Sequence, residues 1–266
     1  MSKTNKILIP ALLLLFGYSA VDLSCYFLDF YRSKMQISKL ERMMEDPIVR
    51  PYSVIMNSNS PDAISTNNPI PAQGEEMLPQ FQNLYAKNAD IIGWVKIDGT
   101  PVSYPVMQTQ GDAEFYLNHG FDKKENQNGL PFLDIGCNIL RSPVLLIHGH
   151  SMKNGHIFGE LLKYEDNAYY EAHPVIQVSS LFEKADYRIM AVIMSRIYPQ
   201  SERRFKYYQI EETDTEAGFN RYILNVKSLS LYETGISSTY GDTIVVLSTC
   251  EYSTENGRLA VIARKE

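Results

Sequence analysis

The 266-residue sequence has few cysteines and no excess of positive charge. Its three cysteines, Cys25, Cys137 and Cys250, are widely spaced and odd in number, which excludes the framework of a disulfide-stabilised secreted domain. With 31 Asp and Glu against 25 Lys and Arg, the formal net charge is -6. An acidic surface repels phosphate backbones, so no nucleic acid is expected as a partner.

The sequence also lacks the short motifs that bind metals and nucleotides. It contains no C-x-x-C or H-E-x-x-H pattern and no third convergent Cys or His ligand. Glycine-rich phosphate loops are absent as well. We therefore expect no metal ion and no other cofactor, which leaves any chemistry to ordinary side chains.

The one long hydrophobic run lies at the N-terminus. Residues 7–21, ILIPALLLLFGYSAV, carry no charge, and the run extends to Leu28 with only Asp22 intervening. This length reaches the roughly 20 residues that cross a bilayer, and the aromatic residues that follow suit the far interface. We expect residues 1–31 to form a cytoplasmic tail and a single-pass anchor in the cell membrane, with the rest of the chain extracellular.

Two other interpretations of this segment remain. A cleaved signal peptide has a shorter apolar region and a small-x-small cleavage site, for which Gly17 and Ser19 would serve. A lipoprotein would be modified at Cys25, although Asp22 and Leu23 poorly match the small residues expected before a lipidated cysteine. Both interpretations also place most of the chain outside the cytoplasm.

The rest of the chain divides into a helix with a linker and one domain. Residues 34–45 have the pattern of a short amphipathic helix, and residues 47–73 contain five prolines with many Asn and Ser, which indicates a linker. Residues 32–74 are therefore assigned to this helix and linker, and residues 75–266 to a single domain that begins with a helix. The 44% apolar share is ample for one core.

Within the domain, short β-rich runs alternate with polar turns. Eight strands are expected, at residues 91–97, 102–107, 130–134, 144–149, 175–180, 187–195, 243–249 and 259–264. Short helices are expected near residues 112–117 and 158–164. A longer helix in residues 213–232, between strands six and seven, is predicted by a capping box of Thr213 and Glu216 and by an apolar stripe that extends to Leu229. The fold class is mainly β, a sandwich or barrel with peripheral helices.

A thiol and a guanidinium flank the last expected turn. Cys250 ends one apolar run and Arg258 begins the next, and residues 251–257 between them contain an Asn-Gly turn signal that suits antiparallel neighbours. A thiolate can attack a carbonyl, and a permanent cation beside it can stabilise the oxyanion that forms. Strand alternation places Ser248 on the face of Cys250, within reach of a bound peptide.

The candidate bases are histidines. The sequence has five of them, namely His119, His148, His150, His156 and His173. The strongest context is residues 145–164, where an apolar strand runs into a Gly-containing turn and His150 lies at the strand exit. His148 would share its face, so spacing alone does not separate the two. Cys137 either pairs with Cys250 or is a small buried hydrophobe, and its apolar neighbours favour the second interpretation.

These motifs resemble those of the sortases. VLSTC at residues 246–250, followed by Arg258, is similar to the T-L-x-T-C motif and downstream arginine of that family. Residues 148–164 are similar to the Y-G-H-x-M-x-x-G-x-x-F-x-x-L-x-x-Y segment of class B sortases, and the resemblance selects His150 as the catalytic histidine.

The resemblance to class B sortases spans residue 75 to the C-terminus. Residues 91–108 and 115–121 are also similar to class B segments, and the long helix between strands six and seven is typical of the class. In two places the sequence departs from the pattern. Val246 replaces the first threonine of the cysteine motif, and His148 stands where the family has an aromatic residue.

The resemblance implies an eight-stranded sortase-type β-barrel and a cysteine transpeptidase. Cys250 would attack the threonine carbonyl of an LPxTG- or NPxTN-like sorting signal on a surface protein, His150 would protonate the leaving amine, and Arg258 would hold the oxyanion. An amino group of a peptidoglycan precursor or cross-bridge would then resolve the thioacyl enzyme. The residues expected to bind substrate are Ser248, Thr249 and Glu251.

Other functions remain open. A pilin polymerase of class B type would use a pilin lysine as the acceptor, whereas the Asp-Pro-aromatic lid of dedicated class C pilin sortases is only weakly matched by residues 46–48. The S-x-G-C-x-R pattern of L,D-transpeptidases is missing. In a different class, the protein would be a membrane-tethered binding module with an inert cysteine.

Overall fold

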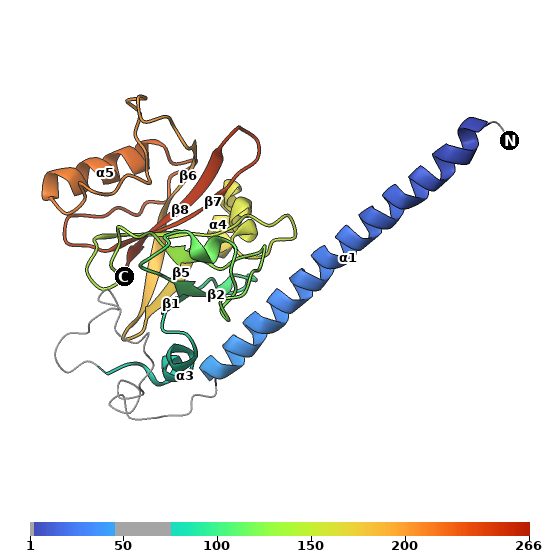
Figure 1. Cartoon of the computed structure of the whole chain (residues 1–266). Helices are drawn as coiled ribbons and strands as arrows, with labels where there is room; N and C mark the ends of the chain where they lie inside the picture. The colour runs from blue at the N-terminus through green and yellow to red at the C-terminus, as the bar shows by residue number, and fades with distance from the viewer. Residues whose placement is uncertain (1–2, 46–75) are drawn as a thin grey trace.

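The computed structural model describes residues 3–45 and 76–266, and the linker predicted at residues 47–73 lies outside these ranges. Figure 1 shows a β-rich body from which one long helix projects. The elements are, in chain order, α1 (Lys3–Glu45), α3 (Pro79–Lys87), β1 (Ile91–Lys96), β2 (Ser103–Met107), η1 (Phe115–Leu117), β3 (Phe132–Leu133), β4 (Val144–His148), η2 (Gly159–Glu165), α4 (Asn167–Ala172), β5 (Val175–Ser180), β6 (Lys184–Arg196), α5 (Glu216–Ser228), β7 (Ile244–Cys250) and β8 (Gly257–Lys265).

The eight strands close into one barrel in the order β1-β2-β3-β4-β7-β8-β6-β5. Neighbouring strands are antiparallel except for β2 with β3 and β4 with β7, which are parallel. Apolar side chains of the central strands, among them Leu146, Val246 and Ile262, are fully buried. The predicted mainly-β barrel of eight strands is therefore confirmed.

The register of three neighbouring strands determines which residues share one rim of the barrel. β4 and β7 run parallel with His148 opposite Ser248, so both strands end at the same rim. β8 returns antiparallel to β7, with Arg258 opposite Cys250. The β7–β8 hairpin predicted from the Asn-Gly signal is thus confirmed, and Asn256 adopts the positive φ of 57° that such a turn uses.

The predicted helix between strands six and seven is present as α5, but it begins later than expected. Thr215, not Thr213, is the N-cap, and its hydroxyl oxygen accepts a hydrogen bond from a backbone N–H of the first turn at 3.2 Å. The Thr213 hydroxyl instead donates to a carbonyl of the preceding turn at 2.7 Å. Because α5 ends at Ser228, Leu229 leaves the predicted apolar stripe and is 46% exposed.

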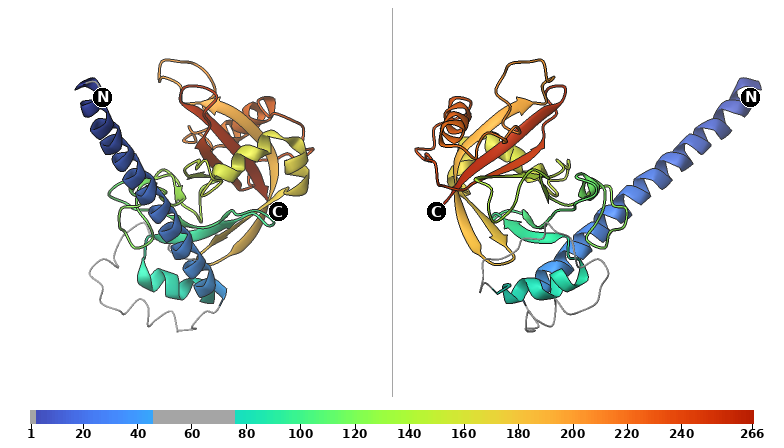
Figure 2. Two further views of the ribbon diagram at one scale, coloured as in Figure 1. Left: turned by 90° about the vertical axis from the view of Figure 1, so that its right-hand side faces the viewer. Right: turned by 60° about the vertical axis from the view of Figure 1, so that its left-hand side comes forward.

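The N-terminal helix is one continuous element of 43 residues, so the short helix predicted at residues 34–45 is its C-terminal part. Figures 1 and 2 show that the end of α1 lies beside α3 and the barrel, while its start projects away. Ser33, Ile37 and Leu40 are buried in this contact. The last turns of α1 therefore belong to the packed body.

One prediction about the N-terminus is corrected. Within residues 3–45 and 76–266, no helix combines the length and the apolar character that a membrane crossing requires. The single-pass anchor predicted for residues 1–31 is therefore wrong, as are the membrane contact and the localisation inferred from it.

His156 connects α1 to the barrel. Its Nδ1 lies 3.0 Å from the Tyr104 hydroxyl and its Nε2 lies 3.3 Å from the Ser33 hydroxyl. The Phe30 ring packs edge-on against the imidazole, with 5.5 Å between centroids. Burial in this contact lowers the pKa of His156 to about 4.

Acid is expected to weaken this contact. Because the pKa of His156 is lower in the folded protein than in the unfolded chain, the contribution of His156 to stability is complete above about pH 6.5 and is lost as the pH falls toward 4. For a partly buried ring we expect a loss on the order of 2 kcal/mol. Urea unfolding at pH 7 and pH 4.5 should show a smaller acid loss for His156→Gln than for the wild type. A matched His173→Gln variant should keep the wild-type loss, and equal losses in all three proteins would contradict the assignment.

Candidate active site

A pocket of about 260 Å³ lies at the rim where β4 and β7 end and β8 begins. Its lining consists of Ala113, Glu114, Leu117, Phe132, Asp134, Ile135, His148, Gly149, His150, Ser248, Thr249, Cys250 and Arg258. Of the six predicted site residues, the pocket brings together His150, Ser248, Thr249, Cys250 and Arg258. The sixth, Glu251, is not part of the lining.

The pocket holds a free thiol beside a cation. Cys250 is the last residue of β7, is partly exposed and forms no disulfide. Arg258 lies opposite it on β8, and its Nη1 donates to the Gly257 carbonyl at 2.9 Å. Within the described part of the chain, no carboxylate forms an ion pair with Arg258. Its charge is therefore available to a developing oxyanion or a substrate carbonyl.

His150 follows β4 at the same rim. Its Nε2 lies 2.7 Å from the Leu117 carbonyl. Because a carbonyl only accepts hydrogen bonds, Nε2 carries a proton and Nδ1 is the nitrogen that can exchange a proton with a reacting group. The His150 carbonyl accepts a hydrogen bond from the Phe158 N–H at 2.9 Å, which holds the following loop against the barrel.

Two hydrogen bonds join the segments that carry the histidine and the thiol. The Thr249 hydroxyl donates to the Gly149 carbonyl at 2.8 Å, and the Gly149 N–H donates to the Ser248 carbonyl at 3.1 Å. Thr249 and Ser248 are both buried. The Thr249 side chain is thus engaged in fixing the position of His150 relative to Cys250.

The side chain of Glu251 is engaged in the β7–β8 turn. One of its carboxylate oxygens accepts from the Ser253 N–H and the other from the Ser253 hydroxyl, both at 2.6 Å. Its backbone N–H donates to the Gly257 carbonyl at 3.0 Å. Glu251 therefore shapes the turn that connects the thiol strand to the arginine strand.

Tyr207 lies behind the pocket and was not found from the sequence. Its hydroxyl is 2.6 Å from the Ser248 hydroxyl, and the ring is buried. Burial raises the pKa of Tyr207 to about 12, while the Ser248 hydrogen bond and the charge of Arg258 act in the opposite direction. Tyr207 follows the last barrel strand before α5, where no sequence pattern indicates that it would reach β7.

The sequence indicates only one member of a second pair of residues in the pocket. His148 Nε2 lies 3.2 Å from Asp134 Oδ2, and both side chains line the pocket. The hydrogen bond from His148, more than any other influence, lowers the pKa of Asp134. His148 departs from the class B pattern, but no signal in the sequence indicates Asp134 as its partner.

The second thiol of the domain is inert. Cys137 is buried, and its Sγ lies 3.4 Å from both the Val144 carbonyl and the Leu146 N–H. Burial raises the pKa of Cys137 to about 12. The interpretation of Cys137 as a small buried hydrophobe is confirmed, and the alternative of a disulfide with Cys250 is wrong.

The other histidines lie away from the pocket. His119 stacks on Phe115 with 3.8 Å between ring centroids, and its Nδ1 is 2.7 Å from the Phe115 carbonyl. His173 Nδ1 is 3.0 Å from the Asp98 carbonyl. His156 lies in the contact with α1 described above.

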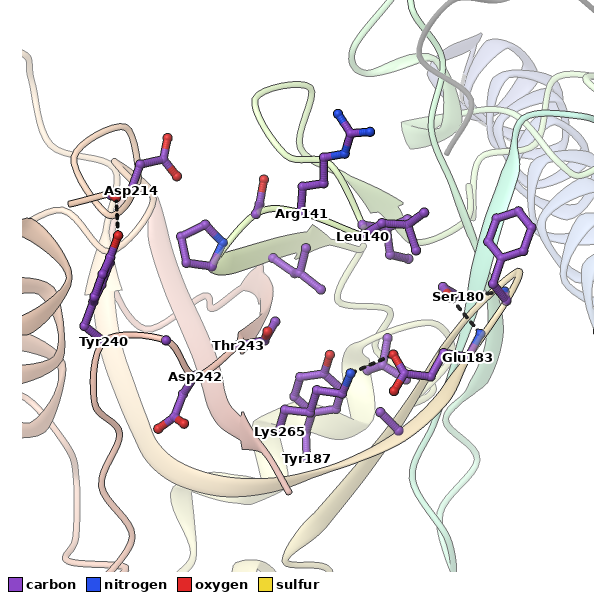
Figure 3. A pocket seen from close by; sticks show the side chains of 18 of the residues that line it. Leu140, Arg141, Ser180, Glu183, Tyr187, Asp214, Tyr240, Asp242, Thr243 and Lys265 are labelled. Carbon is purple, nitrogen blue, oxygen red and sulfur yellow. Dashed lines mark hydrogen bonds and ion pairs between the residues drawn. The ribbon is translucent and has the colours of Figure 1, made fainter. Parts of the chain in front are cut away.

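A larger cavity, of about 930 Å³, lies at the other end of the barrel, around the starts of β4 and β7 (Figure 3). In it Lys265 pairs with Glu183 at 2.7 Å, and the Tyr240 hydroxyl donates to the Asp214 carbonyl at 2.9 Å. Among the described residues that line this cavity there is no cysteine or histidine. The smaller pocket therefore contains the reactive groups.

Gly149 is expected to be essential for the position of His150. A Cβ added at Gly149 would lie 2.5 Å from the Phe158 ring, which is fully buried and has no room to move. Gly149→Ala should cost about 1–3 kcal/mol of stability and reduce activity, because the His150 segment must shift. Gly111→Ala is the matched control, since no atom lies within 4 Å of its added Cβ. Chemical unfolding and activity of both variants give the measurement, and equal behaviour of the two would contradict this account.

Comparison with known proteins gives consistent results. No family model matches the sequence. The chain is 30% identical over 203 residues to sortase B of Listeria monocytogenes, which covers 75% of this chain and 77% of that protein. It is 24% identical over 262 residues to sortase B of Staphylococcus aureus, which covers 97% of this chain and 94% of that protein.

Solved structures show the same similarity. The fold is similar to sortase B from B. anthracis, with a TM-score of 0.69, 25% identity, and coverage of 90% of this chain and 98% of that one. It is also similar to a Staphylococcus aureus sortase B-substrate complex, with a TM-score of 0.64, 26% identity, and coverage of 72% and 87%.

Proposed function

Because this chain belongs to the sortase B family, we propose that it cleaves an LPxTG- or NPxTN-like sorting signal through a thioacyl intermediate on Cys250. The enzyme then transfers the acyl group from Cys250 to an amino group. The observation that carries the proposal is the free thiol of Cys250 opposite Arg258, with His150 in the same pocket. Arg258 has no ion-pair partner among the described residues. We assign the activity to residues 75–266.

In the first half-reaction, the Cys250 thiolate attacks the threonine carbonyl of the sorting signal. Arg258 donates hydrogen bonds to the oxygen on which negative charge develops. His150, as the imidazolium, gives its proton to the leaving amine when the peptide C–N bond breaks. The products of this step are a thioester on Cys250 and a neutral His150.

In the second half-reaction, an amine attacks the thioester. The C–S bond breaks, Cys250 leaves as the thiolate, and His150 takes a proton from the attacking nitrogen. This restores the thiolate and imidazolium pair. Over one cycle, His150 takes up as many protons as it gives away. Because the reaction needs Cys250 deprotonated and His150 protonated, we expect a bell-shaped dependence of kcat/KM on pH.

The substrates follow from the same proposal. A relative, the sortase B of Staphylococcus aureus, has been solved as a substrate complex, which supports sorting-signal-bearing surface proteins as the acyl donors here. The acceptor is a primary amine of a peptidoglycan precursor or cross-bridge. A pilin lysine supplies the same chemistry and is the alternative acceptor.

Substrate binding is proposed for the floor of the pocket. Ser248 and Thr249 line it beside Cys250, and Glu251 supports it from the adjoining turn. Because the hydroxyls of Ser248 and Thr249 are bonded within the protein, their contribution to the sorting signal is the shape of the floor.

A peptide library tests the proposal. The full-length chain is incubated with sorting-signal peptides and triglycine, and the cut bond is sequenced. We expect cleavage after a threonine, transfer to triglycine, and loss of both after treatment with a methanethiosulfonate that labels Cys250. A Cys250 that is not labelled, together with no cleavage of any library member, would instead indicate a binding module with an inert cysteine.

A further inference from the structure

A second histidine shares the pocket with the proposed catalytic residues. His148 ends β4 opposite Ser248 of β7, and Cys250 lies two residues further along β7. From strand geometry, the two backbones are about 5 Å apart across the sheet and about 7 Å apart along it. A small molecule held between His148 and Cys250 is therefore within reach of both side chains.

Asp134 determines which nitrogen of His148 is free. Its Oδ2 lies 3.2 Å from His148 Nε2, and its Oδ1 accepts from the Gly136 N–H at 2.9 Å, which holds the carboxylate in place. Because an ionised carboxylate only accepts hydrogen bonds, the proton of neutral His148 is on Nε2. Nδ1 has no hydrogen-bond partner among the residues that the structure describes, so it keeps a free lone pair.

Charged groups of both signs line the pocket around His148. The Asp134 carboxylate lies 3.2 Å from its imidazole and the Phe132 ring is tilted against it at 5.4 Å between centroids, and Glu114 is a further carboxylate in the lining. Cys250, Arg258 and His150 line the same pocket. A protonated amine is attracted to the carboxylates, while a carbonyl oxygen is attracted to the guanidinium.

We propose that His148, oriented by Asp134, is the base that takes the first proton from the incoming ammonium group of the acceptor. This inference rests on the proposed transpeptidase function and deepens it, since it assigns the acceptor side of the pocket to the β3–β4 wall. His148 is a further catalytic residue, and Asp134 is its positioning residue.

The proton balance requires a second acceptor of protons. A primary amine arrives as R–NH3+ and attacks only as R–NH2, so one proton goes to His148 Nδ1 before the C–N bond forms. After attack, the nitrogen loses another proton to His150, which is neutral because it has already protonated the leaving amine. The C–S bond then breaks to give the Cys250 thiolate, and His148 returns its proton to water.

The test uses one variant that keeps the hydrogen bond but removes the base, and a second that changes the positioning residue. His148→Gln can still donate to Asp134 through its amide, whereas it cannot take a proton. Full-length wild type, His148→Gln and Asp134→Asn are acylated with a cleavable sorting-signal peptide. Each is then offered triglycine, whose amine is largely protonated at neutral pH, or hydroxylamine, which is not. His173→Gln, outside the pocket, is the matched control.

We expect His148→Gln to react with triglycine at least about 10-fold more slowly at pH 7. Acylation and the reaction with hydroxylamine should stay within about 2-fold of wild type. The defect should shrink as the pH approaches the pKa of the triglycine amine, about 8, because a free amine needs no base. Asp134→Asn should show the same pattern with a smaller defect.

Three results would overturn the inference. If His148→Gln reacts with triglycine at the wild-type rate across the pH range, His148 takes no part in the reaction. An equal loss with hydroxylamine and triglycine would make its role structural, and a loss confined to acylation would place it in the first half-reaction. Failure of the wild-type enzyme to form any thioacyl adduct would instead refute the proposed function itself, which is a separate outcome.

Discussion

Cys250→Ala is expected to abolish both cleavage of the sorting signal and transfer to an amine, with a loss of at least about 10⁴-fold in kcat/KM. The reason is chemical, because the side chain that forms the thioester is removed and no other thiol lines the pocket among the described residues. Cys250 is partly exposed at the end of β7, so its truncation leaves the barrel core intact. The measurement is steady-state kinetics with a cleavable peptide and triglycine.

The matched control is Cys137→Ala. Cys137 is buried and its thiol is held between backbone groups of β4, so this variant should retain activity while losing some stability. Its thiol also stays protonated at neutral pH, because burial raises its pKa to about 12. Full activity of Cys250→Ala, or loss of chemistry in a folded Cys137→Ala, would assign the reaction to a different group.

Arg258→Ala is expected to give the second largest effect. Removal of one donor to a developing oxyanion typically costs about 10²–10³-fold in kcat, or about 3–4 kcal/mol. Arg258 fits this role because it lies opposite Cys250 and has no carboxylate partner among the described residues. The loss should appear in kcat as well as in kcat/KM, since the contact strengthens in the transition state.

Two further substitutions make the Arg258 result specific. Arg258→Lys keeps the charge but loses the planar pair of donors, so it should recover only part of the activity. Arg264→Ala is the matched control on the same strand, because Arg264 lies near the far end of β8 and donates to the Ser237 carbonyl at 2.9 Å. A loss of less than about 3-fold for Arg258→Ala would remove Arg258 from the catalytic machinery.

The fold was largely predictable because its strands are short, apolar and separated by clear turn signals. The β7–β8 hairpin could be anticipated from the Asn-Gly signal alone, since local turn chemistry determines the antiparallel register. Element ends were less certain. Thr213 and Thr215 both offer a capping hydroxyl, and only the path of the preceding turn decides that Thr215 caps α5.

The N-terminal helix shows where hydrophobic patterning misled the prediction. The apolar run at residues 7–21 predicts a membrane anchor, but α1 continues as one helix to Glu45. Its last turns are packed against the body through Ser33, Ile37 and Leu40. A hydropathy pattern reports only local hydrophobicity. It does not show which part of a long helix packs against a segment distant in the sequence.

The site was predictable only where neighbours in sequence are neighbours in space. Cys250 and Arg258 lie on one hairpin, whereas His150 reaches them through the parallel pairing of β4 with β7. The family resemblance, and not residue spacing, selected His150. Tyr207 and Asp134 were missed because their partners, Ser248 and His148, come from strands that no local pattern connects to them.

The most direct test of the central claim is mass spectrometry of the full-length protein after brief mixing with a cleavable sorting-signal peptide and no added amine. We predict a mass increase equal to the acyl fragment that ends in threonine, located by digestion on the peptide containing Cys250 and released by triglycine. Peptide cleavage without any adduct, or an adduct on Cys137 or another residue, would contradict the thioacyl mechanism.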